Sequence, residues 1–80
     1  MIKDNPYKFN YMMLGRLQAD VKYFLGYGGG NVKHLYYDTI DEHIGEMKRL
    51  WNNFPNELKP EWLTYDEIEE YESQMKNREL

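Results

Sequence analysis

The chain has 80 residues, 10 of them basic and 14 acidic, and its formal net charge is −4. This length allows one domain, and so short a chain buries only roughly 60% of the surface that its unfolded form exposes. The absence of cysteine excludes disulfides, thiolate–zinc sites and thiol nucleophiles. The acidic balance argues against a general nucleic-acid clamp, which usually has a basic face.

No apolar run approaches the roughly 18 residues that a membrane span needs. The N-terminal sequence MIKDNPYKFN also lacks the apolar segment of a signal peptide, so we expect a cytoplasmic protein with no membrane partner. Aromatic residues make up 16% of the sequence, including 8 Tyr and 2 Trp. Most of these rings are expected in the core, but some must be partly exposed, where Tyr and Trp suit protein–protein contact.

The first periodic segment predicts a helix from about Tyr7 to Leu25. Asn5 suits the N-cap of this helix and Pro6 its first position. Gly26 follows the last periodic residue, where we expect a left-handed C-cap. The apolar stripe recurs at spacings of three and four and consists of Leu14, Leu17, Val21, Phe24 and Leu25. The apolar surface is extended at the front by Phe9, Met12 and Met13.

The second helix has the clearest pattern, with one apolar face along its whole length. That face consists of Ile40, His43, Ile44, Met47, Leu50, Trp51 and Phe54. Thr39 and Glu42 have the spacing of a capping box at its start, and Pro55 prevents it from continuing. Glu46 and Arg49 lie one turn apart on the opposite, solvated side.

The third helix is predicted to begin at Thr64, which forms a second capping box with Glu67. Its thin apolar edge consists of Ile68, Tyr71 and Met75. The connection NNFPNELKPEWL before it contains two prolines and cannot be helical throughout. We expect Trp62 and Leu63 to turn inward and lock this crossing.

The stretch GYGGGNVKHLYYD, residues 26–38, joins the first two helices. A phosphate-binding loop would place its glycines after a buried strand and follow its lysine with Ser or Thr. Here the glycines follow a helix and His34 follows Lys33, so the pattern does not favour a bound nucleotide. The sequence predicts a single, compact, mainly α domain over residues 1–80. It has three helices and a Gly-rich turn, and a short extended segment at VKHLYY stays open.

The sequence gives little support for a catalytic or a metal-binding site. His34 and His43 are the only histidines, and one turn on from His43 stands Met47 rather than a carboxylate, so no metal-binding pair is indicated. Ser73 is the only serine, and both threonines are better explained as helix caps. We therefore expect a protein that is not an enzyme and that has no cofactor and no metal.

Two surfaces are candidates for contact with a partner. The Gly-rich turn carries rings and polar groups that suit partner binding: Tyr27, Asn31, Lys33, His34, Tyr36 and Tyr37. Cations beside stacking rings are also found in single-strand binders, although so few cations in an acidic chain disfavour nucleic acid. The alternative surface is an acidic face on the third helix, formed by Glu67, Glu69, Glu70 and Glu72. Such a face resembles a nucleic-acid mimic, but it is more often a solvated, well-capped helix start.

Three segments carry a family resemblance: DVKYFLGYGGGNVKHLYY, HIGEMKRLWNNFP and KPEWLTYDEIEEYE. In order and spacing they resemble the large polyvalent protein-associated domain of the eleventh type, over roughly residues 11–72. The resemblance implies a setting in phages, plasmids and conjugative elements, where counter-defence roles are suspected. It supplies no catalytic residues.

The resulting hypothesis is a non-catalytic accessory protein of a mobile genetic element that acts in the host cytoplasm by binding a host protein. Its target would be a defence-system nuclease or complex, which makes the protein an anti-CRISPR or anti-restriction type of inhibitor. The alternative is a small nucleic-acid-binding or regulatory protein of a phage or plasmid. Exposed aromatic residues leave a homodimer open.

Overall fold

The computed structural model describes residues 7–31, 33, 35 and 39–79. Its elements are α1 (Lys8–Leu25), α2 (Ile40–Asn53), the short 3₁₀ helix η2 (Asn56–Leu58) and α3 (Tyr65–Arg78). The predicted three-helix, mainly α fold is confirmed, and the described residues contain no strand. Most of the segment VKHLYY lies outside the described residues, so the extended segment stays a prediction. Asn5 and Pro6 also lie outside them, but α1 begins at Lys8 with Tyr7 as its N-cap and no side-chain cap, so the predicted start of this helix was wrong.

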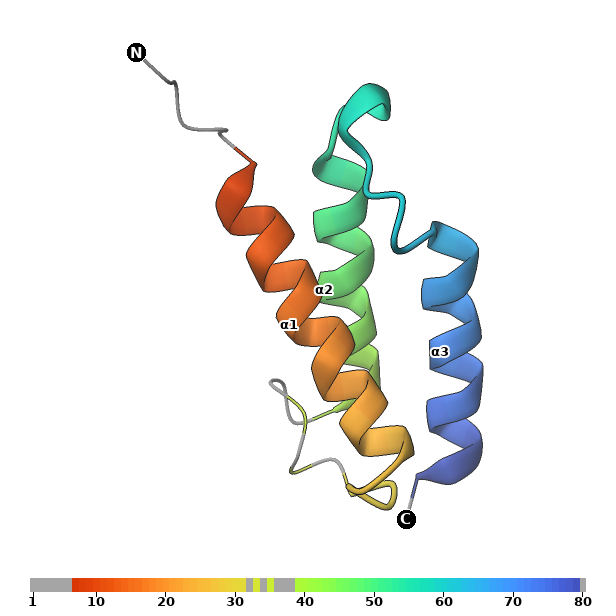
Figure 1. Ribbon diagram of the computed structural model, residues 1–80. Helices are drawn as coiled ribbons and strands as arrows, with labels where there is room; N and C mark the ends of the chain where they lie inside the picture. The colour runs from red at the N-terminus through yellow and green to blue at the C-terminus, as the bar shows by residue number, and fades with distance from the viewer. Residues whose placement is uncertain (1–6, 32, 34, 36–38, 80) are drawn as a thin grey trace.

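The three helices all pack against one another. In Figure 1, α1 crosses in front of α2, while α3 runs alongside α2. The start of α1 and the connection through η2 lie at one end of the molecule, and the Gly-rich turn lies at the other, near the end of α3. No described helix is both long enough and apolar enough to cross a membrane.

The core is formed by the stripes that the sequence predicts. The buried apolar residues are Leu14, Leu17, Val21, Phe24, Leu35, Ile40, Ile44, Met47, Leu50, Phe54, Leu63, Ile68 and Met75. Trp51 and Tyr71 are half-buried against them. Removal of this apolar surface from water is the main force that holds the helices together, because each contributes one apolar stripe.

Phe9 and Met12 depart from the expected extension of the core, since they are 70% and 64% exposed. Both residues fall out of register with Leu14 and Leu17, so the helix turns them away from α2 and α3. Met13 is partly buried at the edge of the core.

Side-chain caps fix the starts of α2 and α3. The Thr64 hydroxyl accepts from the Glu67 N–H at 3.1 Å and the Glu67 carboxylate accepts from the Thr64 N–H at 2.8 Å, which completes the predicted capping box. At α2 the Thr39 hydroxyl accepts from the Glu42 N–H at 3.1 Å. The Glu42 carboxylate there accepts from the Thr39 hydroxyl, so only one arm of the expected box is as predicted.

The connection from α2 to α3 turns Leu63 inward but leaves Trp62 47% exposed, so the expectation for Trp62 was wrong. Trp51, instead of Trp62, packs against this connection, and its indole N–H donates to the Leu63 carbonyl at 3.0 Å. The Lys59 ammonium covers the Trp51 ring at 4.5 Å and donates to the Trp51 and Phe54 carbonyls. Neighbouring side chains in a non-helical segment point in different directions, so burial of Leu63 turns Trp62 outward.

The Gly-rich turn closes the end of α1 in a different way from the one predicted. Gly26 has φ −107° and is not left-handed, whereas Gly29 and Gly30 have φ 62° and 82°. Beyond Gly26 the chain wraps back over the last helical turn, where the Gly28 and Gly30 amides donate to the Tyr23 and Phe24 carbonyls. Those carbonyls have no partner further along the helix, so the turn satisfies them.

Gly30 also brings the turn against the end of α3. A Cβ atom at Gly30 would lie 2.1 Å from the Arg78 carbonyl oxygen, whereas one at Gly29 would meet nothing within 4 Å. Both residues have positive φ, so they differ mainly in this contact. The close approach at Gly30 gives the glycine cluster a structural role, because it joins the first loop to the last helix.

His43 is the one polar residue in the buried set, with no exposed surface. Its Nε2 lies 2.9 Å from the Leu17 carbonyl oxygen, so Nε2 carries the proton and donates from α2 to α1. Burial lowers the pKa of His43 below its usual value, although the Leu17 carbonyl and the Asp20 carboxylate act in the opposite direction. The ring is a core hydrogen-bond donor between two helices.

The contact at Gly30 predicts that alanine destabilises the protein more at Gly30 than at Gly29. Gly29→Ala should cost about 1–2 kcal/mol of stability, the usual cost of a left-handed alanine. Gly30→Ala should cost about 1–3 kcal/mol more, because the new methyl group overlaps the Arg78 carbonyl. Urea unfolding of both variants measures the difference, and truncation after Asn77 should remove it. Equal costs in the full-length chain would contradict the contact.

His43 predicts a loss of stability in mild acid. The unfolded chain takes up a proton near pH 6.5, while the folded chain does so only at lower pH, because its pKa is lowered. The free energy of unfolding should therefore fall as pH decreases below about 6.5, until the folded pKa is reached. Urea unfolding between about pH 7 and 5 measures this slope. His43→Gln, whose amide can still donate to Leu17, should flatten it, and His34→Gln serves as the matched control.

Candidate functional site

A stripe of large apolar side chains on the outer face of α1 is exposed to solvent. Phe9, Met12 and Tyr23 are 70%, 64% and 45% exposed, and Tyr27 in the following turn is 95% exposed. The helical members are separated by three and eleven residues, which places them on one side of α1. Phe9, Met12, Met13 and Arg16 line a shallow hollow of about 170 Å³ there. We call Phe9, Met12, Arg16, Tyr23 and Tyr27 the outer face.

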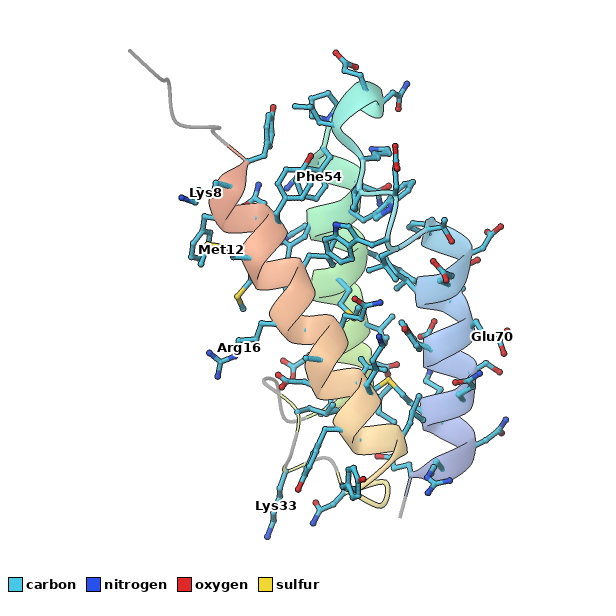
Figure 2. All side chains as sticks on the ribbon, in the orientation of Figure 1. Lys8, Met12, Arg16, Lys33, Phe54 and Glu70 are labelled. Atoms are coloured by element: carbon cyan, nitrogen blue, oxygen red, sulfur yellow. The ribbon has the colours of Figure 1, made fainter. Side chains whose placement is uncertain are left out.

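The surroundings of the outer face are basic although the chain as a whole is acidic. Among residues 7–31, 33 and 35 the positive side chains are Lys8, Arg16, Lys22 and Lys33, and Asp20 is the only negative one. Figure 2 shows Lys8, Met12 and Arg16 projecting away from α2 and α3, with Lys33 at the turn below and Glu70 at the opposite edge. The α1 side is thus net positive, while the carboxylates of α2 and α3 lie among the cations Lys48, Arg49, Lys76 and Arg78.

Three of the six partner-binding residues predicted in the turn lie in the described part of the chain. Tyr27 and Lys33 are exposed, and the Asn31 side-chain oxygen accepts from the Lys33 N–H at 3.0 Å. The Tyr27 ring lies 6.4 Å from the Tyr23 ring, which joins the turn to the outer face. His34, Tyr36 and Tyr37 lie outside the described residues.

The acidic-face alternative on α3 is weakened by local pairing. Glu67 serves as the N-terminal cap, and Glu72 lies 3.3 Å from the Lys48 ammonium and 3.6 Å from that of Lys76. Lys76 also pairs with Asp41 at 2.9 Å, and this carboxylate raises the pKa of Lys76. Glu69 and Glu70 are exposed, and Gln74 donates to Glu70 at 3.2 Å. Half of the proposed acidic face is therefore engaged in holding the fold.

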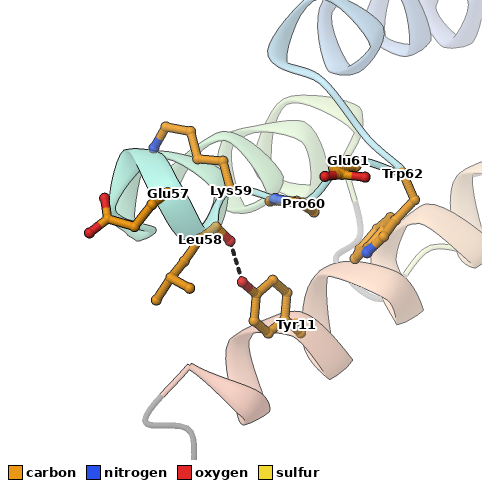
Figure 3. Close-up of a pocket in the computed structure, with 7 residues that line it drawn as sticks. All are labelled: Tyr11, Glu57, Leu58, Lys59, Pro60, Glu61 and Trp62. Carbon is orange, nitrogen blue, oxygen red and sulfur yellow. Dashed lines mark hydrogen bonds between the residues drawn. The ribbon is translucent and has the colours of Figure 1, made fainter.

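A second hollow, of about 440 Å³, lies between the start of α1 and the connection that follows α2. Figure 3 shows the Tyr11 ring on one side and the Trp62 indole on the other, with Pro60 and Glu61 along the edge. The Tyr11 hydroxyl donates to the Leu58 carbonyl, and its ring stacks on Phe54 at 4.5 Å. We call this hollow the Tyr11–Trp62 groove. The sequence pattern missed it because Trp62 was expected in the core.

The described residues show no arrangement for metal chemistry, since no group of three His, Asp or Glu side chains among them could hold a metal ion. His43 is fully buried and donates to a main-chain carbonyl, so solvent and substrates do not reach it. The features available for function are exposed rings, apolar side chains and charges.

The comparisons with known proteins agree with the motifs in the sequence. The profile of the family described as Large polyvalent protein-associated domain 11 matches residues 7–75. No curated protein and no solved structure matches the chain. The match covers α1, the Gly-rich turn, α2 and α3 up to Met75. The chain therefore belongs to the Large polyvalent protein-associated domain 11 family.

Proposed function

We propose that this chain is a non-catalytic accessory protein of a mobile genetic element that binds a host protein through the outer face of α1. The observation that carries the proposal is the exposure of Phe9, Met12, Tyr23 and Tyr27 along one side of the molecule. A small monomer rarely leaves so many large apolar side chains in water along one line unless another surface covers them.

The composition of the outer face supports a protein partner. Aromatic residues, methionine and arginine are enriched in the cores of protein interfaces. Methionine adapts its shape to different partners, and the tyrosines supply rigid contact area with a polar tip. Lys8, Arg16, Lys22 and Lys33 around this face favour a partner with an acidic rim.

Host-defence antagonism is the role that we propose for this binding. The family resemblance places such domains in phages, plasmids and conjugative elements, where counter-defence roles are suspected. An inhibitor of this kind works by covering a surface of a defence nuclease or complex, so it requires no catalytic group. The protein would act in the host cytoplasm, where its target is found.

A nucleic-acid-binding role is the second candidate, and the net positive charge of the α1 side favours it. Four cations are spread along α1 and the turn that carry Tyr23 and Tyr27, so phosphates and stacked bases could both find partners on this side. Eight of the 14 acidic residues belong to α2 and α3, and Glu70 of α3 lies at the edge opposite Arg16 (Figure 2). We rank this candidate lower because four cations can neutralise only a few phosphates, which limits the affinity for nucleic acid.

Substitutions in the outer face should abolish function without unfolding the protein. Met12→Ser combined with Tyr27→Ala removes two anchors, and their loss should weaken partner binding at least about ten-fold. Host cells that carry the defence system and express the wild type should admit a challenging phage, while cells expressing the double variant should not. Plating efficiency measures this effect, and circular dichroism checks the fold.

The matched control is Glu69→Gln combined with Glu70→Gln, which changes two exposed residues on the opposite side. This control should keep wild-type activity. If it loses activity and the outer-face variant keeps it, the acidic face is the site and our assignment is wrong. If the wild type protects no phage from any defence system tested, the antagonist role is wrong.

The second candidate predicts a salt-dependent affinity for single-stranded DNA. Four cations give a slope of log K against log salt of at most roughly −3, at about 0.7 for each phosphate neutralised. Lys22→Met with Lys33→Met should reduce that slope by about 1.4. Fluorescence anisotropy with a labelled oligonucleotide measures both values. No binding near physiological salt removes this candidate.

A further inference from the structure

The Tyr11–Trp62 groove is a second surface, separate from the outer face, with walls that are fixed in advance. The Tyr11 ring is held from two sides, by its stacking on Phe54 and by its hydrogen bond to the Leu58 carbonyl. Pro60 is buried and has a restricted backbone. Binding to such a groove loses little conformational entropy, because its walls need no reordering.

Trp62 gives the groove an exposed aromatic surface. Its side chain is 47% exposed, although Trp51 and Leu63 close by are buried or half-buried. In Figure 3 the Trp62 indole extends toward the side of Tyr11, so its ring faces the hollow. Tryptophan has the ring that attracts cations best, and it is the residue type most often found at binding hot spots.

The charges at the edge of the groove are negative. Glu57 and Glu61 are exposed, and no ion pair to either carboxylate is found among the described residues. Lys59 forms no ion pair with either carboxylate in the described part of the chain, because its ammonium donates to the Trp51 and Phe54 carbonyls and covers the Trp51 ring. Figure 3 shows the Lys59 side chain leading away from Tyr11, while Glu61 lies beside Pro60 and Trp62.

An aromatic wall beside an unpaired carboxylate is complementary to one kind of side chain. A guanidinium group is planar, so it can stack on an indole while its edge donates two hydrogen bonds to a carboxylate. Lysine offers a point charge without this geometry, and phosphate groups are repelled by the negative rim. The hollow of about 440 Å³ has room for one long side chain with adjoining backbone.

We propose that the Tyr11–Trp62 groove binds an arginine-bearing segment of a partner protein. The guanidinium stacks on the Trp62 indole and pairs with Glu61, and the aliphatic part of the arginine side chain packs against Tyr11 and Pro60. This surface prefers a basic segment, whereas the outer face prefers an acidic rim. The two sites can therefore be tested, and can fail, independently.

The experiment is an NMR titration of the full chain with a capped pentapeptide that has a central arginine. The indole N–H of Trp62, assigned with Trp62→Phe, should shift and saturate, while that of Trp51 changes little. Replacement of the arginine by the uncharged isostere citrulline should weaken binding about ten-fold or more, and replacement by lysine several-fold. Equal affinity for the arginine and citrulline peptides would overturn the proposal.

Matched variants locate the site. Glu61→Gln should weaken binding of the arginine peptide about five- to ten-fold. Glu69→Gln removes the same charge from α3 and should leave the affinity for the peptide unchanged. Trp62→Ala should abolish the peptide-induced shifts of the Tyr11 and Glu61 main-chain amides, with the fold intact by circular dichroism, since the Trp62 side chain is half-exposed. If both glutamine variants lowered the affinity equally, the peptide would be attracted only by the overall negative charge of the protein, and the proposed site would be rejected. Concentration-dependent shifts of Trp62 without peptide would show that a second copy covers the groove, which also overturns the proposal.

Discussion

The packing of Phe54 is the constraint on which the rest of the structure depends. It follows the last residue of α2, is 2% exposed, and contacts both Tyr7 and Tyr11 of α1 through its ring. Its carbonyl accepts from Lys59, which ties the next segment to the end of the helix. One residue therefore fixes how α1 meets α2 and where the connection to α3 begins. The Tyr11–Trp62 groove exists because that connection cannot close over the Tyr11 ring.

The surplus of aromatic residues explains why exposed surfaces remain. Trp51 rather than Trp62 occupies the place beside Leu63, where its indole N–H donates to the Leu63 carbonyl and its ring lies tilted against the Tyr65 ring at 5.4 Å. Lys59 covers the remaining face of Trp51. A thin three-helix core has no second place for an indole, so Trp62 stays in solvent. Its exposure costs stability, which makes a binding role a natural explanation.

The sequence could predict the parts of the fold that depend on periodicity and short-range capping. Leu14 to Phe24 and Ile40 to Phe54 repeat at helical spacing, and Thr64 with Glu67 is a local signal. It could not predict which glycines are left-handed, since nothing in the local pattern distinguishes Gly26 from Gly29 and Gly30. The contact of Gly30 with Arg78 joins residues far apart in the chain, so the pattern could not predict it either. Of the site, Tyr27 and Lys33 were found as exposed residues. Phe9, Met12 and Trp62 were missed, because hydrophobicity alone does not tell an inner face from an outer one.

The net charge of −4 is the composition value most open to misreading. It argues against nucleic acid only if charge is spread evenly, but residues 7–35 carry four cations and one carboxylate, whereas residues 39–79 carry five cations and eleven carboxylates. The carboxylates on α3 are partly neutralised by Lys48 and Lys76, while those at Glu57 and Glu61 are not. Each surface must therefore be judged by its own charges. On that basis the partners that we propose for the outer face and for the groove have opposite charge, so one small domain would join two different chemical groups on the same target.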